Sequence, residues 1–243
     1  MANSIAIALI GYGRMGKEIE KMAISRGHEI VARIDPDVTG EDFNSPSLSK
    51  ADVAIVFTTP KAAVSNFLDC FKLNLPVVTG TTGWLDEIDK IKEWCNNKGQ
   101  TLFYASNFSI GVNILFELNK RLAELMNTQP NYDLDITEIH HTKKLDAPSG
   151  TAIELAKEVI NNLDRKEKWE LDKQPDKETI KVNAKREGNV PGTHTVKYES
   201  NADEISIHHK AKSREGFALG AVMAAEFTIN NKGFLTMKDL LKF

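Results

Sequence analysis

A glycine-rich segment between a strand-like run and a helix-like run is the feature that most constrains the fold. Residues 4–10 (SIAIALI) are typical of a buried parallel strand, and residues 14–26 follow a helical pattern. The sequence between them, GYGRMG, fits GxGxxG. In such a unit the first glycine permits a tight turn, the second lets a pyrophosphate approach the backbone, and the third lets helix and strand pack closely. The segment therefore predicts a dinucleotide-binding unit.

The first hundred residues continue this alternation, which is typical of a parallel α/β sheet. An acidic residue, Asp35, closes the second expected strand, where its side chain would accept hydrogen bonds from an adenosine ribose. A glycine-rich turn with an unrelated surface aspartate is the alternative interpretation. We expect further strands over residues 29–34, 53–57, 76–78 and 101–104, and helices over residues 61–73 and 84–97.

The pattern changes after Asn107, so the sequence predicts two domains with a boundary near that residue. The second half is expected to be α+β with mostly antiparallel pairing, and residues 164–178 are expected to form a charged, irregular connection. Helical patterns return near the C-terminus. The expected helices cover residues 111–126, 151–162, 217–227 and 238–243, and the expected strands cover residues 133–140, 179–186, 193–200 and 204–208.

Charge and apolar content exclude several classes of protein. There are 31 Lys and Arg residues against 34 Asp and Glu residues, which gives a net charge of −3 and no electrostatic signature of nucleic-acid binding. The longest apolar runs are too short to span a bilayer, and no signal peptide is recognisable. Two cysteines, Cys70 and Cys95, form neither a disulfide framework nor a CxxC motif. We expect a cytoplasmic protein without membrane or nucleic-acid partners.

Residues 138–152 (EIHHTKKLDAPSGTA) carry the strongest chemical signal in the second half. Two histidines and two lysines precede a Pro-Ser-Gly-Thr turn that opens a helix, and a helix N-terminus attracts anions. His140 and His141 point to opposite sides of an extended segment, so they should have different roles. A solvated basic loop with a helix cap explains the same residues. A second pair, His208 and His209, raises metal binding, but neither pair has HExxH spacing, and we expect no metal site.

This segment resembles the signature of the dihydrodipicolinate reductase (4-hydroxy-tetrahydrodipicolinate reductase) family of lysine and diaminopimelate biosynthesis. The resemblance extends over essentially the whole chain. It implies a Rossmann-like domain over residues 1–107 and 216–243, a smaller α+β mixed-sheet domain for substrate binding and oligomerisation over residues 108–215, and a homotetramer. The other similar segments are residues 57–60 (FTTP), 79–83 (TGTTG), 105–109 (ASNFS), 186–194 (REGNVPGTH) and 209–214 (HKAKSR).

The resemblance also implies roles for individual residues. His140 matches the general acid/base and Lys144 a second proton donor, whereas His141, Gly150 and Thr151 match substrate contacts. The implied reaction transfers a hydride from NADH or NADPH to an unsaturated cyclic dicarboxylate and yields tetrahydrodipicolinate. The residues that match the cofactor site, including the glycine loop itself, are Gly11, Tyr12, Gly13, Arg14, Met15, Gly16, Asp35, Gly80, Thr81, Thr82, Ala105, Ser106, Asn107 and Phe108.

Two departures from the family pattern bear on the cofactor. The glycine loop is one residue shorter than in many members, and Asp35 is followed by Pro36 and Asp37 instead of a basic residue. A carboxylate there hydrogen-bonds a free 2′-hydroxyl and repels a 2′-phosphate, so NADH is expected to serve at least as well as NADPH unless Arg14 or Arg33 turns toward the phosphate. The competing hypotheses are another two-domain dehydrogenase, acting on a sugar or an amino acid, and a dinucleotide-sensing regulator without turnover.

Overall fold

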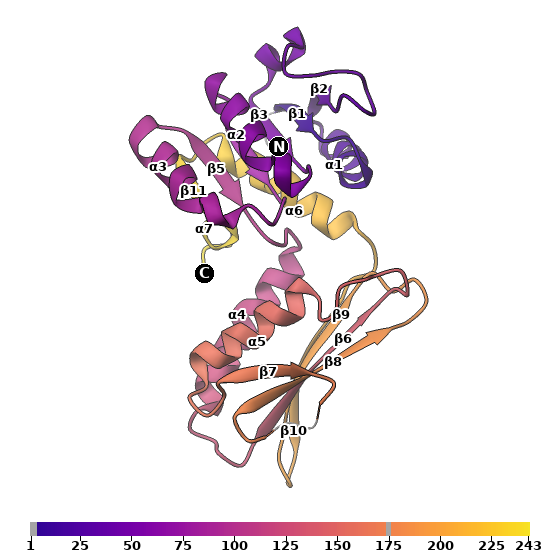
Figure 1. Cartoon of the computed structure of the whole chain (residues 1–243), viewed down its shortest axis with the longest axis vertical. Coiled ribbons are helices and arrows are strands. Elements are labelled where there is room, and N and C mark those ends of the chain that lie inside the picture. Colours follow the sequence, from indigo (N-terminus) through magenta and orange to yellow (C-terminus); the bar gives the residue numbers. More distant parts are fainter. Residues whose placement is uncertain (1–3, 174–175) are drawn as a thin grey trace. The chain divides into compact units, whose positions relative to one another are not determined.

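The computed structural model describes residues 4–173 and 176–243. The chain forms two compact units, coloured along the sequence in Figure 1. Unit 1 comprises Met1–Ser109 and Glu215–Phe243, and unit 2 comprises Ile110–Arg214. The boundary between the two units follows Ser109, two residues beyond Asn107.

Unit 1 is built on a six-stranded sheet in which every pair of neighbours is parallel. The strands are β1 (Ala6–Ile10), β2 (Glu29–Ile34), β3 (Val53–Val56), β4 (Val77–Thr79), β5 (Thr101–Tyr104) and β11 (Gly233–Thr236). Their order is β11-β5-β4-β3-β1-β2, so the direction of strand addition reverses between β1 and β3. Ligands of such sheets bind beyond the carboxyl ends of the strands at this reversal. The expected Rossmann-like parallel sheet is confirmed.

Helices cover both faces of this sheet, which explains why its central strands β1 (AIALI) and β3 (VAIV) are apolar along their whole length. One face packs on α1 (Arg14–Ser25) and α6 (Glu215–Thr228), and the other packs on α2 (Pro60–Lys72) and α3 (Ile88–Lys98). The remaining short helices are η1 (Pro46–Lys50), η2 (Leu85–Glu87) and α7 (Met237–Leu241).

The C-terminal segment returns to unit 1 through close contacts. In α6, a Cβ atom added to Gly220 would lie 1.8 Å from the carbonyl oxygen of Phe108, so only glycine allows this approach. Glu226 of the same helix accepts a hydrogen bond from Arg26 at 2.8 Å and lies 2.7 Å from Nε2 of His28. The sixth strand, β11 (GFLT), was not expected because only two of its four residues are apolar.

Unit 2 contains a five-stranded mixed sheet covered on one face by two helices, α4 (Ile110–Met126) and α5 (Gly150–Asn162) (Figure 1). The strand order is β10-β9-β6-β8-β7. The strands are β6 (Asp133–His140), β7 (Lys168–Leu171), β8 (Thr179–Arg186), β9 (Thr193–Glu199) and β10 (Glu204–Lys210).

Two expectations for this unit were wrong. Pairing is not mostly antiparallel, because β6–β8 and β7–β8 are parallel while β6–β9 and β9–β10 are antiparallel. The crossover through α5 returns the chain in the direction of β6, and such a connection gives parallel pairing. Residues 164–178 are not wholly irregular either, since β7 lies within them. Across the described part of the chain, no helix is long and apolar enough to cross a membrane.

Candidate active site

The glycine loop lies at the strand reversal in unit 1, where β1 and β3 end side by side. Gly11 has φ +89°, and a Cβ atom there would lie 2.2 Å from the carbonyl oxygen of Phe57. A Cβ atom on Gly16 would lie 2.5 Å from the carbonyl oxygen of Gly11, whereas one on Gly13 would have no atom within 4 Å. The outer glycines therefore allow close packing, and Gly13 leaves open space beside the backbone, as a pyrophosphate requires.

Two cavities flank this loop and share Gly13, Phe57 and Thr58 in their walls. The first, about 350 Å³, joins the start of α1 to the loop after β4. The second, about 480 Å³, lies against the end of β2. Of the residues expected in the cofactor site, Gly13, Arg14, Met15, Gly16, Gly80, Thr81 and Thr82 line the first cavity, and Gly11, Gly13 and Asp35 line the second.

Asp35 is joined to the glycine loop by a backbone contact. The N–H of Tyr12 donates a hydrogen bond to Oδ2 of Asp35 at 2.7 Å. The Tyr12 hydroxyl hydrogen-bonds Glu20, which also forms an ion pair with Arg33. Hydrogen bonding to Arg33, opposed by partial burial, lowers the pKa of Glu20. Arg33 is thus engaged inside unit 1, and Tyr12 contributes its backbone to the loop while its side chain supports this network.

The segment after β5 plays a packing role in unit 1. The N–H of Ala105 donates to the carbonyl oxygen of Thr79 at 3.2 Å. Phe108 is 2% exposed, and its ring centroid lies 5.8 Å from that of Phe57 and 5.9 Å from that of Phe103. Within the described residues, none of 105–108 lines either of the two cavities. Phe108 instead packs against Gly80 and Phe57, which line the first cavity, since a Cβ atom on Gly80 would touch both aromatic rings.

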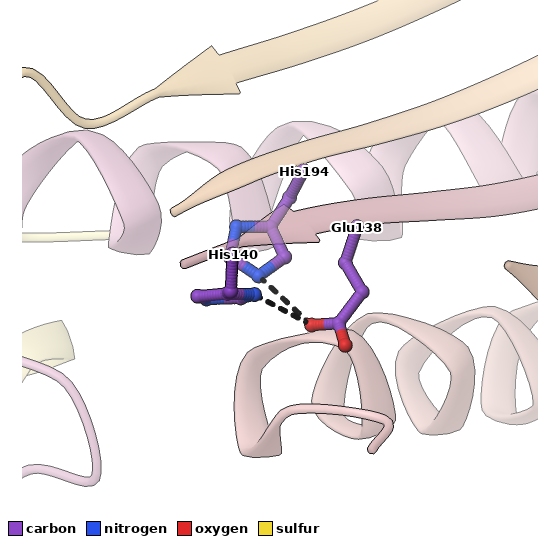
Figure 2. Close-up of side chains that lie close together, drawn as sticks. All are labelled: Glu138, His140 and His194. Carbon is purple, nitrogen blue, oxygen red and sulfur yellow. Dashed lines mark ion pairs between the residues drawn. The ribbon is translucent and has the colours of Figure 1, made fainter. Parts of the chain in front are cut away.

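In unit 2 the structure brings together three buried ionisable side chains, Glu138, His140 and His194 (Figure 2). Glu138 and His140 are two residues apart on β6 and therefore share a face, and His194 is the β9 residue paired with Glu138. Oε2 of Glu138 lies 3.1 Å from Nδ1 of His140 and 3.9 Å from Nε2 of His194. The two imidazole rings meet edge to face at 5.1 Å.

The other carboxylate oxygen of Glu138 is held by two donors. Oε1 accepts hydrogen bonds from Nη2 of Arg186 and from the N–H of Ser149, each at 3.1 Å. Burial alone would raise the pKa of Glu138, but hydrogen bonds from His140 and Ser149 outweigh it and lower the pKa to about 2. Burial, with the neighbouring His140, lowers the pKa of His194 to about 3. At neutral pH this gives an ionised carboxylate beside a neutral His194.

The Pro-Ser-Gly-Thr turn opens α5 beside this cluster, as expected. Ser149 is the N-cap, and its Oγ accepts a hydrogen bond from the N–H of Ala152 at 3.2 Å and lies 3.2 Å from Nε2 of His194. Gly150 and Thr151 form the first turn. In the preceding loop, the Lys144 ammonium lies 2.8 Å from Oδ2 of Asp146.

The lysines and histidines of that loop differ in exposure. Lys143 is exposed, whereas the side chain of Lys144 is 21% exposed. His140 is 8% exposed, and His141 is half-buried.

The donor atoms of Glu138, His140 and His194 lie within 4.8 Å of one another, so a metal ion must be considered. The surroundings do not suit a cation. Arg186 places a positive charge 3.1 Å from the carboxylate, and the nearest nitrogen of His194 already faces the Ser149 hydroxyl. The expected absence of a metal site stays a prediction, and these contacts argue for it.

The residue types alone assigned no role to Glu138, Arg186 or His194. A usable signal was present, because strand periodicity places Glu138 on the same face as Leu134 and Ile136, which are both buried. A carboxylate in such a series requires hydrogen-bond partners.

Comparison with known proteins identifies the family. The model for the N-terminus of dihydrodipicolinate reductase matches residues 5–108, and that for its C-terminus matches residues 111–241. A 4-hydroxy-tetrahydrodipicolinate reductase from Christiangramia forsetii is 52% identical over 97% of this chain and 97% of its own length. Another from Thermosipho africanus is 38% identical over 96% of both chains.

Solved structures show the same fold. A dipicolinate-bound dihydrodipicolinate reductase from Paenisporosarcina sp. TG-14 has a TM-score of 0.77 and 22% identity, covering 96% of this chain and 98% of its own. An apo scyllo-inositol dehydrogenase from Lactobacillus casei has a TM-score of 0.55 and 12% identity, covering 95% and 88%. These two structures share a fold, so the fold alone does not identify the family. The two family models and the full-length relatives do identify it: the chain belongs to the dihydrodipicolinate reductase family, the pyridine-nucleotide-dependent reductases of lysine and diaminopimelate biosynthesis.

Proposed function

We propose that this chain reduces 4-hydroxy-tetrahydrodipicolinate to tetrahydrodipicolinate through the His140–Lys144 loop of unit 2. The observation that carries this assignment of residues is the buried Glu138–His140 contact, next to a helix N-terminus and a partly buried lysine. Net replacement of the substrate hydroxyl by hydrogen requires a hydride and a proton, and the hydroxyl leaves as water. NADH or NADPH, when bound by unit 1, would supply the hydride.

In unit 1 the glycine loop would hold the pyrophosphate. Its backbone lies at the N-terminus of α1, whose partial positive charge favours phosphate. Asp35 would bind the adenosine ribose, and residues Gly80–Thr82 of the first cavity would contact the nicotinamide end. NADH is favoured over NADPH because Asp35, Asp37 and Asp42 all line the second cavity. Ala105–Phe108 would contribute through backbone and packing.

In unit 2 the start of α5 would hold a substrate carboxylate. Gly150 and Thr151 form its first turn, and the helix dipole stabilises an anion there by about 0.3–1 kcal/mol. His141 would contact the substrate beside this turn. Lys144 would donate a proton to the ring nitrogen, and His140 would act as the general acid/base. The Lys144–Asp146 ion pair lies on the surface of this loop and would open when the substrate's carboxylates compete for the ammonium.

A domain division follows from these roles: residues 1–107 and 216–243 bind the dinucleotide, and residues 108–215 bind the substrate and carry the assembly surface. We also propose a cytoplasmic homotetramer. The edge strand β10 supports assembly, because its outer backbone edge has no partner strand in the described sheet and Ile205 is 42% exposed. Light scattering should then give four times the chain mass of 27.1 kDa.

A coupled assay tests the reaction. Substrate is made in place from aspartate semialdehyde, pyruvate and the partner synthase, and absorbance of NADH or NADPH is followed. Turnover that depends on all three components is expected, with no oxidation of scyllo-inositol in a parallel assay with NAD⁺. Cofactor binding without turnover would support a dinucleotide sensor instead.

A further inference from the structure

Glu138 is the most deeply buried acidic side chain of unit 2 among the described residues, with no exposed surface, and it contacts three separate segments. Oε2 faces Nδ1 of His140 on β6, and Oε1 accepts from Ser149 at the start of α5 and from Arg186 on β8. One carboxylate thus joins the expected general acid/base, drawn beside it in Figure 2, to the expected carboxylate-binding turn.

The contact between Glu138 and His140 defines where the imidazole proton lies. Oε2 and Nδ1 are buried and lie 3.1 Å apart as an ion-pair contact, and neither atom has another hydrogen-bond partner or an ideal hydrogen bond to the other in the described part of the protein. A proton on Nδ1 satisfies both atoms at once, because a carboxylate can only accept. The neutral ring then carries its lone pair on Nε2.

The opposite edge of the His140 ring is kept uncovered by a glycine. A Cβ atom on Gly192 would lie 3.1 Å from Nε2 and 3.4 Å from Cδ2 of His140. Any side chain at this position would press on the nitrogen that exchanges the proton. The sequence run 186–194 therefore supplies both a guanidinium for Glu138, from Arg186, and a clear edge for His140, from Gly192.

The charged groups around Glu138 keep it ionised without competing for His140. Arg186 on β8 supplies the balancing positive charge, and the Arg186 Nη2 also donates to the carbonyl oxygen of Asp146 at 2.6 Å. His194 on β9 is neutral at pH 7, because burial lowers its pKa to about 3, and its Nε2 faces the Ser149 hydroxyl. Lys144 in the loop is paired with Asp146.

From this geometry we propose that Glu138 is a positioning residue that holds His140 in the Nδ1–H tautomer and orients its Nε2 for proton transfer. Its contact with Ser149 ties this orientation to the first turn of α5. The proposal rests on the proposed function only in taking His140 as the group that exchanges the proton. An analogous arrangement, in which a carboxylate fixes the tautomer of an imidazole, governs the reactivity of histidines in many sites.

The tautomer can be measured directly on the intact protein. Long-range ¹H–¹⁵N correlation spectra distinguish protonated from unprotonated ring nitrogens, and His140→Gln identifies the signal among the six histidines. The wild type should show His140 as Nδ1–H. Glu138→Gln, which puts an amide in place of the carboxylate, should abolish this preference. Asp135→Asn, on the opposite face of β6 and paired with Lys197, should leave it unchanged. An Nε2–H tautomer in the wild type overturns the proposal, and this result does not depend on whether Glu138→Gln folds.

Kinetics give the second readout. Glu138→Gln should lower kcat by about 10–100-fold, the usual cost of removing an orienting partner, with KM and the Kd of NADH nearly unchanged. The pH profile of kcat/KM should also shift, whereas Asp135→Asn should reproduce the wild-type profile. Unchanged kcat and pH profile in Glu138→Gln would overturn the proposal. Should His140→Gln keep full activity while the Nδ1–H tautomer is observed, the positioning stands and the proposed role of His140 falls.

Discussion

The backbone N–H of Tyr12 donates a hydrogen bond to Oδ2 of Asp35 at 2.7 Å, and this contact joins the glycine loop to the end of β2. The carboxylate is thereby fixed at the border of the second cavity, which Asp37 and Asp42 also line. Arg33, the nearest cation along the strand, is held by Glu20. A 2′-phosphate in this cavity would meet three carboxylates, whereas Arg14 lines the first cavity.

Replacing Asp35 by serine should reverse part of this preference. The variant loses the acceptor for the ribose hydroxyls and the repulsion of a 2′-phosphate, so the ratio of kcat/KM for NADPH to that for NADH should rise about tenfold, which corresponds to about 1.4 kcal/mol. Steady-state kinetics with both cofactors measure this ratio. Asp69→Asn, on the exposed side of α2, is the control and should leave it unchanged. A wild-type enzyme that strongly prefers NADPH would contradict the argument.

Two glycines of α6 provide a matched test of how the C-terminal segment packs. Gly220→Ala places a methyl group 1.8 Å from the Phe108 carbonyl oxygen and should destabilise the protein by about 1–3 kcal/mol or more. Gly216→Ala meets its nearest atom at 3.9 Å and should be neutral or stabilising by up to about 1 kcal/mol, because alanine favours a helix. Urea unfolding measures both. Equal stability of the two variants would show that α6 does not pack against Phe108 in solution.

Local patterns predicted most of unit 1 because most of its strands contain apolar runs and its helices are long enough to show their period. Strands β1–β5 and the helix after the glycine loop lie where the sequence indicated. Strands β7 (KWEL) and β11 (GFLT) were missed, since each has only two apolar residues among four. The parallel pairing of β6 and β8 was missed because it depends on the crossover through α5.

The same limit applies to the site. The glycine loop and the loop at 140–151 are continuous in sequence, so their residue types alone suggested a function. The Glu138 cluster is assembled from three strands, and its partners Arg186 and His194 lie 48 and 56 residues further along the chain (186−138 and 194−138). Only strand register brings these side chains together.

The free energy of unfolding should fall in two steps below neutral pH, the first caused by His194 and the second by Glu138. His194 has a folded pKa of about 3 against about 6.5 in an unfolded chain, so its contribution is complete above pH 6.5 and is lost as the pH falls toward 3. Glu138, at about 2 against an unfolded value of about 4.3, adds a loss below pH 4.3. Unfolding free energies by urea titration should drop by about 2 kcal/mol between pH 6.5 and 5 from His194 alone.

The variant His194→Gln separates the contribution of His194 to this pH dependence from the contributions of the other titrating groups. Glutamine takes no proton in this range, so the drop in unfolding free energy between pH 6.5 and 5 should become smaller by about 2 kcal/mol. Asn201→Gln, in the exposed segment between β9 and β10, changes no titrating group and should keep the wild-type slope. Identical slopes in wild type and His194→Gln would mean that His194 is not held neutral.

The central claim, that the loop of unit 2 carries positioned proton transfer, is tested most directly by two neighbouring lysines. Lys144→Ala should lower kcat by about 10²–10⁴-fold, because it removes a positioned proton donor. Its NADH affinity should be nearly unchanged, since the glycine loop and both cavities belong to unit 1. Lys143→Ala, which removes the same charge from an exposed position, should cost less than about tenfold. Steady-state kinetics with NADH titration of both variants give the answer. Equal losses of kcat in the two variants would contradict the account, because they would show general electrostatic attraction in place of a positioned acid.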